Sequence, residues 1–276
     1  MPQRKWLHRS LPLRPVRRVE FLDLSAGTVR VSVEGVGSPL LLLTGLGGNL
    51  DLWGPLVPHL RGFELLAFDP PGTGASGPVR RALGMPGMAD LAAEVLDTLG
   101  RERVDVLGYS WGGALAQELA HRHPERVGRL VLCATTCGLG GMPGNPRALA
   151  ELATPWRYAA ATFRAGHCPR LVGYAAQLCA IAQWTSLPWL HQLEQPTLIV
   201  AAEHDAVAPI GNSRLLAGRI PDSRVHVVTG AGHLLLIDEP ESVAPVVRSF
   251  LLQATSAGAG RGARGVWSFL ARSRTG

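Results

Sequence analysis

Short apolar runs alternate with amphipathic stretches over most of the chain. Runs with the length of a buried strand lie at 40–43, 65–68, 104–108, 129–134, 197–202 and 225–228. Apolar residues recur at helical spacing in 88–99 and 240–252, and the β-rich stretches 19–24 and 28–33 flank the turn-forming residues 25–27. A hairpin followed by strands that alternate with helices predicts an α/β protein with a largely parallel, doubly wound sheet.

The alternation breaks in residues 137–191. Glycines and prolines open this stretch, and short amphipathic segments rich in tryptophan, tyrosine and leucine follow. Because it lies after the sixth predicted strand and before the seventh, we expect an insertion that folds as a helical cap on a core formed by 19–136 and 192–253. A basic N-terminal arm, 1–18, and a glycine- and arginine-rich tail, 254–276, complete the chain, and we expect the tail to be disordered.

A serine stands between a predicted strand and a predicted helix, in the run Gly108-Tyr109-Ser110-Trp111-Gly112. Glycines two positions before and after it allow strand and helix to approach closely, as in the sharp turn called a nucleophile elbow. Such a turn holds the hydroxyl exposed in a strained conformation, and the helix that begins there directs free N–H groups toward a developing oxyanion. Ser110 is therefore the predicted nucleophile, and the backbone N–H of Trp111 is a predicted oxyanion donor.

The other candidate groups also follow strands. The glycine-rich loop 44–49 comes directly after a strand, and the N–H of its residue Leu46 is the second predicted oxyanion donor. Asp205 follows the seventh strand, and His233 lies in a glycine-flanked loop after the last one. The order Ser110, Asp205, His233 is the order of serine, acid and histidine in α/β-hydrolases. In such a triad the histidine takes the serine proton and the acid orients the imidazole.

Three further polar residues compete for these roles. Asp69 follows a strand in a loop rich in turn-forming residues, but it precedes the serine, whereas the acid of this fold follows it. We therefore expect a structural role for Asp69. Asp205 is favoured over Glu203 because the turn at 206–209 comes after it, and His204 is interpreted as a loop histidine.

Composition excludes several other classes of protein. Hydrophobic residues make up 46% of the 276 residues, which suits one large folded domain. The longest apolar runs are far below the roughly 20 residues of a membrane span, so no transmembrane segment is expected. The four cysteines form no CxxC pair, and no histidine cluster has metal-ligand spacing. We accordingly predict no metal and no other cofactor.

The net charge of +6 is concentrated at the two ends. Residues 1–18 hold six Arg and Lys residues and 254–276 hold four, with no acid in either segment, so the chain between them has a net charge of −4. We therefore do not interpret the basic character as nucleic-acid binding. The arm lacks the continuous apolar segment of a secretory signal. It is interpreted as a solvated arm, with contact to an anionic interface and an organellar transit peptide as open alternatives.

Longer runs add a family resemblance. They are GYSWGGALAQ (108–117), HPER (123–126), WTSLPWLH (184–191), QPTL (195–198), LLAGRIP (215–221) and GHL (232–234). In these runs the chain resembles the intracellular medium-chain-length poly(3-hydroxyalkanoate) depolymerases, over about residues 39–252. The insertion is shorter here than in that family between Leu171 and Gln177, and the basic arm is not part of the family pattern.

The resemblance implies an α/β-hydrolase fold with Ser110, Asp205 and His233 as its triad. It also implies hydrolysis, through an acyl-enzyme, of a polyester of 3-hydroxy fatty acids stored as granules in the cytoplasm, with the granule surface as a partner. Trp184 and Trp189 of the insertion are candidate substrate contacts. Two alternatives stay open: a general carboxylesterase or lipase-like hydrolase of small or medium acyl esters, and a non-catalytic ligand-binding protein of the same fold.

Overall fold

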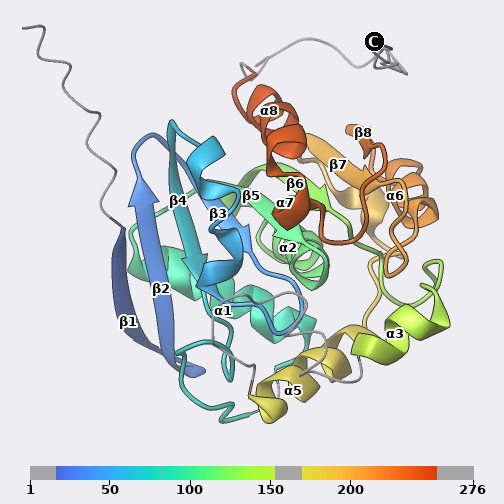
Figure 1. Ribbon diagram of the computed structural model, residues 1–276. Coiled ribbons are helices and arrows are strands. Elements are labelled where there is room, and N and C mark those ends of the chain that lie inside the picture. Colours follow the sequence, from blue (N-terminus) through green and yellow to red (C-terminus); the bar gives the residue numbers. More distant parts are fainter. Residues whose placement is uncertain (1–16, 82, 153–169, 254–276) are drawn as a thin grey trace, which may run out of the picture.

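The computed structural model describes residues 17–81, 83–152 and 170–253. Its centre is an eight-stranded sheet in the order β1-β2-β4-β3-β5-β6-β7-β8 (Figure 1). The strands are β1 (Arg18–Leu24), β2 (Gly27–Gly35), β3 (Ser38–Leu43), β4 (Phe63–Phe68), β5 (Val104–Tyr109), β6 (Val127–Cys133), β7 (Thr197–Ala202) and β8 (Ser223–Val228). Strand β2 pairs antiparallel with β1 and β4, and the pairs from β4 to β8 are parallel. The predicted hairpin and doubly wound sheet are confirmed.

Helices cover both faces of the sheet. The helices in the described part of the chain are α1 (Met85–Thr98), α2 (Trp111–Arg122), α3 (Pro146–Leu152), α5 (Leu171–Ala182), α6 (Ile210–Ala217), α7 (Leu235–Asp238) and α8 (Pro240–Leu251), with the 3₁₀ turns η1 (Leu50–Trp53), η2 (Val57–His59), η3 (Pro124–Arg126) and η4 (Leu190–Gln192). Two cores result, one between the sheet and α1, α2 and α6, and the other between the sheet and η1, α7 and α8.

Strand β3 explains why the apolar runs are continuous rather than alternating. Its residues Leu41 and Leu43 lie in the core with α1 and α2, whereas Leu40 and Leu42 lie in the core with η1, α7 and α8. Successive side chains of a strand point to opposite faces, so a sheet covered on both faces needs apolar residues at every position.

Helices α3 and α5 lie between β6 and β7 in the chain, within the predicted insertion, residues 137–191. In Figure 1 they lie beyond the end of the sheet to which β4 points. The hydroxyl of Tyr174 on α5 donates a hydrogen bond to the carbonyl of Leu152 on α3, at 2.7 Å, which joins the two helices. Residues 153–169 of the insertion, residues 1–16 of the predicted arm and the whole predicted tail lie outside the described residues.

Candidate active site

Ser110 occupies the sharp turn between β5 and α2. Its backbone has φ 54° and ψ −117°, a left-handed conformation that is strained for a residue with a side chain. Hydrogen bonds to its backbone hold it there. The Ser110 N–H donates to the carbonyl of Cys133 at 2.8 Å, and the Ser110 carbonyl accepts from Gly113 N at 2.9 Å and from Thr135 Oγ1 at 2.7 Å. The surrounding strands and helix therefore impose the strained turn that the sequence predicts.

The two flanking glycines are required by close packing. A Cβ atom on Gly108 would lie 2.3 Å from the carbonyl oxygen of Gly112, and one on Gly112 would lie 2.0 Å from the carbonyl oxygen of Leu43. Both distances are far inside van der Waals contact, so no larger residue fits without moving backbone. Strand β5, helix α2 and the end of β3 therefore meet directly at Ser110.

Ser110, His233 and Asp205 form a continuous chain of contacts. Ser110 Oγ lies 2.9 Å from His233 Nε2, and His233 Nδ1 lies 2.9 Å and 2.8 Å from the two carboxylate oxygens of Asp205. The N–H groups of Val207 and Ala208 donate to the same carboxylate at 2.8 Å and 2.7 Å. Since a carboxylate only accepts hydrogen bonds, Nδ1 carries the proton and Nε2 is free to accept the serine hydroxyl.

His233 accepts a hydrogen bond at its backbone carbonyl, and its side chain is buried. Tyr109 Oη donates to the carbonyl oxygen of His233 at 2.9 Å, which fixes the loop after β8. The side chains of His233 and Asp205 are 8% and 0% exposed. By contrast, His204 is mostly exposed, and Glu203 accepts the N–H of Gly230 at 2.8 Å. Of the acids after β7, Asp205 is thus the one in contact with the histidine, as its position in the sequence suggested.

The glycine-rich loop after β3 lies against the serine. A Cβ on Gly45 would be 3.5 Å from Ser110 Cβ, and Gly48 N donates to the Gly45 carbonyl at 2.9 Å to close a tight turn. Leu46, inside this turn, and Trp111, the first residue of α2, are both buried. The two predicted oxyanion donors therefore belong to segments that converge on Ser110 from different elements.

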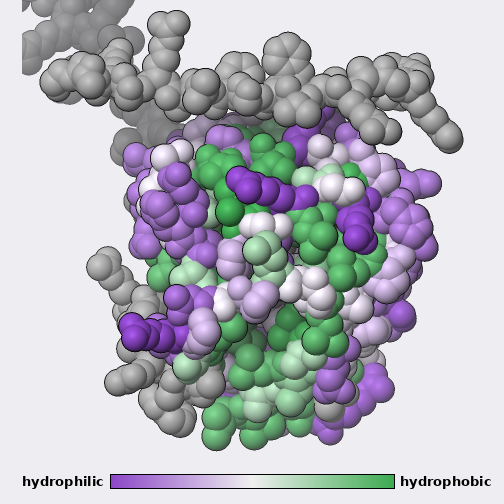
Figure 2. Space-filling view, turned by 90° about the vertical axis from the view of Figure 1, so that its right-hand side faces the viewer, coloured by the Kyte–Doolittle hydropathy of each residue, from purple (hydrophilic) through white to green (hydrophobic). Residues whose placement is uncertain are grey.

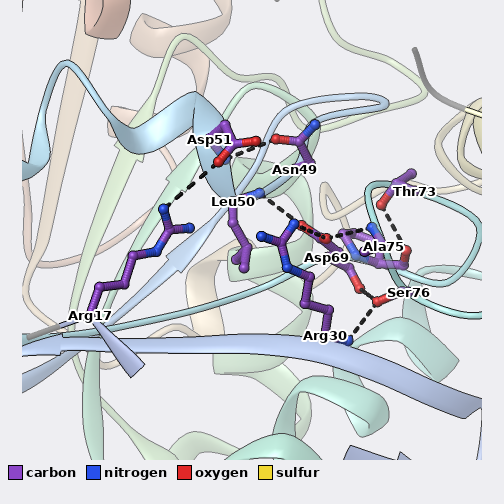
Figure 3. Close-up of polar contacts among 10 residues, drawn as sticks. Arg17, Arg30, Asn49, Leu50, Asp51, Asp69, Thr73, Ala75 and Ser76 are labelled. Atoms are coloured by element: carbon purple, nitrogen blue, oxygen red, sulfur yellow. Dashed lines mark hydrogen bonds and ion pairs between the residues drawn. The ribbon is translucent and has the colours of Figure 1, made fainter. Parts of the chain in front are cut away.

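Asp69 sits in a separate network at the end of β4 (Figure 3). One carboxylate oxygen accepts the N–H of Leu50 at 2.7 Å, and the other accepts the N–H of Ala75 at 2.9 Å and lies 3.4 Å from Arg30 Nη1. Burial raises the pKa of this carboxyl, and the two N–H groups and the arginine oppose that rise. These contacts join the loops after β3 and β4, in agreement with the structural role expected for Asp69.

The two tryptophans predicted to contact substrate, Trp184 and Trp189, contact α2. Trp184 is buried, and its indole N–H donates to Glu118 Oε2 at 2.7 Å, while the Trp189 ring stacks on His121 with ring centroids 4.1 Å apart. At a helical rise of about 1.5 Å per residue, Glu118 and His121 lie roughly 12 and 16 Å along α2 from Ser110. These contacts favour a role in fixing the insertion to α2, and the substrate-contact interpretation gains no support from them.

Sequence reasoning missed Gln177 of α5. This residue is buried and contacts both the glycine-rich loop and Trp111. The buried positions of α5 are Gly173, Tyr174, Gln177 and Ala180, so Gln177 is the amide on an otherwise small or aromatic face. The signal available in the sequence was a polar residue at a position where helical periodicity predicts a buried side chain.

Among the described residues, no group of three or more His, Cys, Asp or Glu side chains is arranged to hold a metal ion.

The sheet order, the turn at Ser110 and the contact chain to His233 and Asp205 define an α/β-hydrolase, and comparison with known proteins agrees. The family model described as alpha/beta hydrolase fold matches residues 38–167 and 139–240. The chain belongs to this family. No helix in the described part of the chain is long and apolar enough to cross a membrane.

Individual relatives cover most of the chain. A poly(3-hydroxyalkanoate) depolymerase from Ectopseudomonas oleovorans is 42% identical over 241 residues, which is 78% of this chain and 85% of the relative. The crystal structure of a hydrolase from Pseudomonas aeruginosa PA01 is 27% identical, with a TM-score of 0.74 over 85% of this chain and 98% of that one. A thermophilic esterase from Thermogutta terrifontis is 25% identical, with a TM-score of 0.72 over the same shares of the two chains.

Proposed function

We propose that the protein is a serine hydrolase that cleaves the ester bonds of medium-chain poly(3-hydroxyalkanoate) or its oligomers. The observation that carries this proposal is the contact chain from Ser110 Oγ through His233 to Asp205, with spacings of 2.9 Å and 2.8 Å, in a chain 42% identical to a poly(3-hydroxyalkanoate) depolymerase. A serine, a histidine and an aspartate in contact in this order activate the serine hydroxyl for attack on an acyl carbon.

In the proposed mechanism Ser110 Oγ attacks the ester carbonyl carbon while His233 Nε2 takes the hydroxyl proton. The carbonyl oxygen becomes an oxyanion and accepts hydrogen bonds from the N–H groups of Leu46 and Trp111. When the C–O bond breaks, His233 returns the proton to the departing alcohol and an acyl-enzyme is left on Ser110. Water, deprotonated by His233, then attacks the acyl carbon. The bond from that carbon to Ser110 Oγ breaks as His233 returns the proton to Oγ, and the acid is released. Asp205 keeps the imidazole oriented and stabilises its protonated form.

A hydrophobic substrate is supported by the insertion. Five large hydrophobic side chains that are exposed in the described residues belong to it, namely Leu139, Met142, Leu149, Leu171 and Val172. Figure 2 shows hydrophobic residues gathered at the lower end of one face, at the height where Figure 1 has α3 and α5. A small pocket, lined mainly by apolar residues of α1, α5 and the loop between β4 and α1, has Trp111 and Gln177 in its wall. We propose that residues 137–191 form a lid over the site, and that the reaction takes place at a granule surface in the cytoplasm.

The test is release of 3-hydroxy acids from an emulsion of medium-chain polyhydroxyalkanoate, measured beside hydrolysis of short and medium p-nitrophenyl esters. The wild type is expected to release acids from the polymer, and Ser110→Ala is expected to abolish release while the protein stays folded. Substituting Ser249, which lies on α8 away from the site, with alanine provides a matched control that should retain activity.

Two other results would change the assignment. Ester hydrolysis without polymer release would favour the alternative, a general carboxylesterase of small or medium acyl esters. If neither substrate were hydrolysed and an active-site-directed phosphonate failed to label Ser110, the hydrolase proposal would be wrong and a ligand-binding protein of this fold would replace it.

A further inference from the structure

Helix α5 of the insertion packs directly on the loops that surround Ser110. A Cβ on Gly173 would lie 2.3 Å from the carbonyl oxygen of Gly72, so the backbone of α5 touches the loop after β4. Residues four apart share one face of a helix, and Gln177 therefore lies on the same face as Gly173. The close approach at Gly173 brings Gln177 down onto the neighbouring loop after β3.

Gln177 contacts both segments that hold the proposed oxyanion donors. Its side-chain oxygen, Oε1, accepts the N–H of Gly47 at 2.8 Å, and Gly47 is the residue directly after Leu46. Its backbone carbonyl accepts the indole N–H of Trp111 at 3.1 Å. The residue is 4% exposed. One residue of the insertion thus ties together the glycine-rich loop and the first residue of α2.

The orientation of the Gln177 amide is fixed by these contacts. Turning the amide over would place its NH₂ group against the N–H of Gly47, two donors facing each other. In the observed orientation Nε2 is buried and has no hydrogen-bond partner among the described residues. An unpaired buried donor costs free energy, so the arrangement favours the contact with Gly47 over full pairing of the amide.

We propose that Gln177 is a positioning residue that fixes both backbone donors of the oxyanion hole, so that docking of α5 completes the hole. This inference rests on the proposed function. Gly47 and Leu46 share a peptide bond, so a hydrogen bond that holds the Gly47 N–H also limits rotation of Leu46. The indole contact likewise limits movement of Trp111 at the start of α2. Preorganised donors act most strongly in the transition state, where the oxyanion carries charge.

The test compares Gln177→Leu with Gln183→Leu. Leucine removes both side-chain polar atoms of Gln177 at similar volume. Gln183, the residue directly after the same helix, is exposed, and its amide donates to Cys179 O at 3.2 Å. The measurements are kcat and KM for a medium-chain p-nitrophenyl ester and the inhibition constant of an alkyl boronic acid. A boronic acid forms a tetrahedral anion on the serine and so reports on the oxyanion hole.

We expect Gln177→Leu to lower kcat about 10- to 100-fold, less than the 10²–10³-fold typical of losing a donor outright, with KM nearly unchanged. The boronic acid should bind more weakly by a similar factor, and Gln183→Leu should change neither value. Trp111→Phe removes only the indole contact and keeps the backbone N–H of residue 111, so it should give a smaller loss of the same kind. This second variant decides the question if Gln177→Leu does not fold.

Three outcomes for Gln177→Leu would overturn the inference: an unchanged kcat, a rise in KM alone, or a fall in kcat with unchanged boronic acid binding. The ester assay separates this result from the proposed function. A wild type that hydrolyses no ester would refute the hydrolase proposal itself, whereas an active wild type whose Gln177→Leu variant is equally active would refute only the role of Gln177.

Discussion

Asp69 and Asp205 are two buried aspartates in the loops that follow parallel strands, β4 and β7. Both side chains are 0% exposed, and both accept two backbone N–H groups. They differ in their third partner. Asp205 contacts the imidazole of His233 at 2.8 Å, whereas Asp69 faces the guanidinium of Arg30 at 3.4 Å.

This third partner separates a group suited to catalysis from a structural one. An arginine stays protonated and has no acceptor atom, so the partner of Asp69 cannot act as a general base. A histidine has a second ring nitrogen, and in this chain that nitrogen lies 2.9 Å from Ser110 Oγ. Burial and a position after a strand are common to both aspartates and therefore do not by themselves identify a catalytic acid.

The largest expected effect is on turnover, and it compares the two aspartates directly. Asp205→Asn should lower kcat by about 10³- to 10⁴-fold, because an amide can donate to Nδ1 and so stabilise the wrong imidazole tautomer. Asp69→Asn should leave kcat nearly unchanged. The measurement is steady-state hydrolysis of a p-nitrophenyl ester well below the unfolding temperature of each variant. Equal losses in the two variants would contradict the distinction between them.

The next effect is on stability and is expected for Asp69. Asp69→Ala leaves the N–H groups of Leu50 and Ala75 without their acceptor and removes the partner of Arg30, so the free energy of unfolding should fall by about 3 kcal/mol. Denaturant unfolding measures it. Asp23→Ala is a suitable control, because Asp23 is exposed and its carboxylate accepts, within the described residues, only a side-chain hydrogen bond from Thr28. A cost as small as that of the control would show that the Asp69 network contributes little.

The smallest effect concerns pH. Burial raises the pKa of Asp69 above its ordinary value of 3.8, so the folded protein keeps this proton at pH values where the unfolded chain has released it. The contribution of this group to stability is then greatest below pH 3.8 and declines as the pH rises through the folded-state pKa. Asparagine does not titrate, so the unfolding free energy of the wild type should fall relative to that of Asp69→Asn over this range. A difference that is constant, or that changes in the opposite direction, would contradict the raised pKa.

Local sequence was sufficient for the elements of the fold and for the candidate triad. The turn at Ser110 needs only a strand, two glycines and a helix within a short segment, and each of these has a recognisable pattern. His233 and Asp205 could be selected because each follows a predicted strand, and parallel strands bring their carboxyl ends to the same edge of the sheet. The alternatives Glu203 and Asp69 were rejected on position in the chain, and their observed contacts are structural.

The sequence by itself determined the order of strands and helices, the apolar runs of a sheet covered on both faces, and the residues able to form a triad. Only the tertiary structure decided which face of the insertion meets the site. Trp184 donates a hydrogen bond to Glu118 of α2, and Gln177 reaches Gly47 across 130 positions of chain. Helical periodicity identifies a buried face but does not identify its partner, because that partner is set by how distant segments pack.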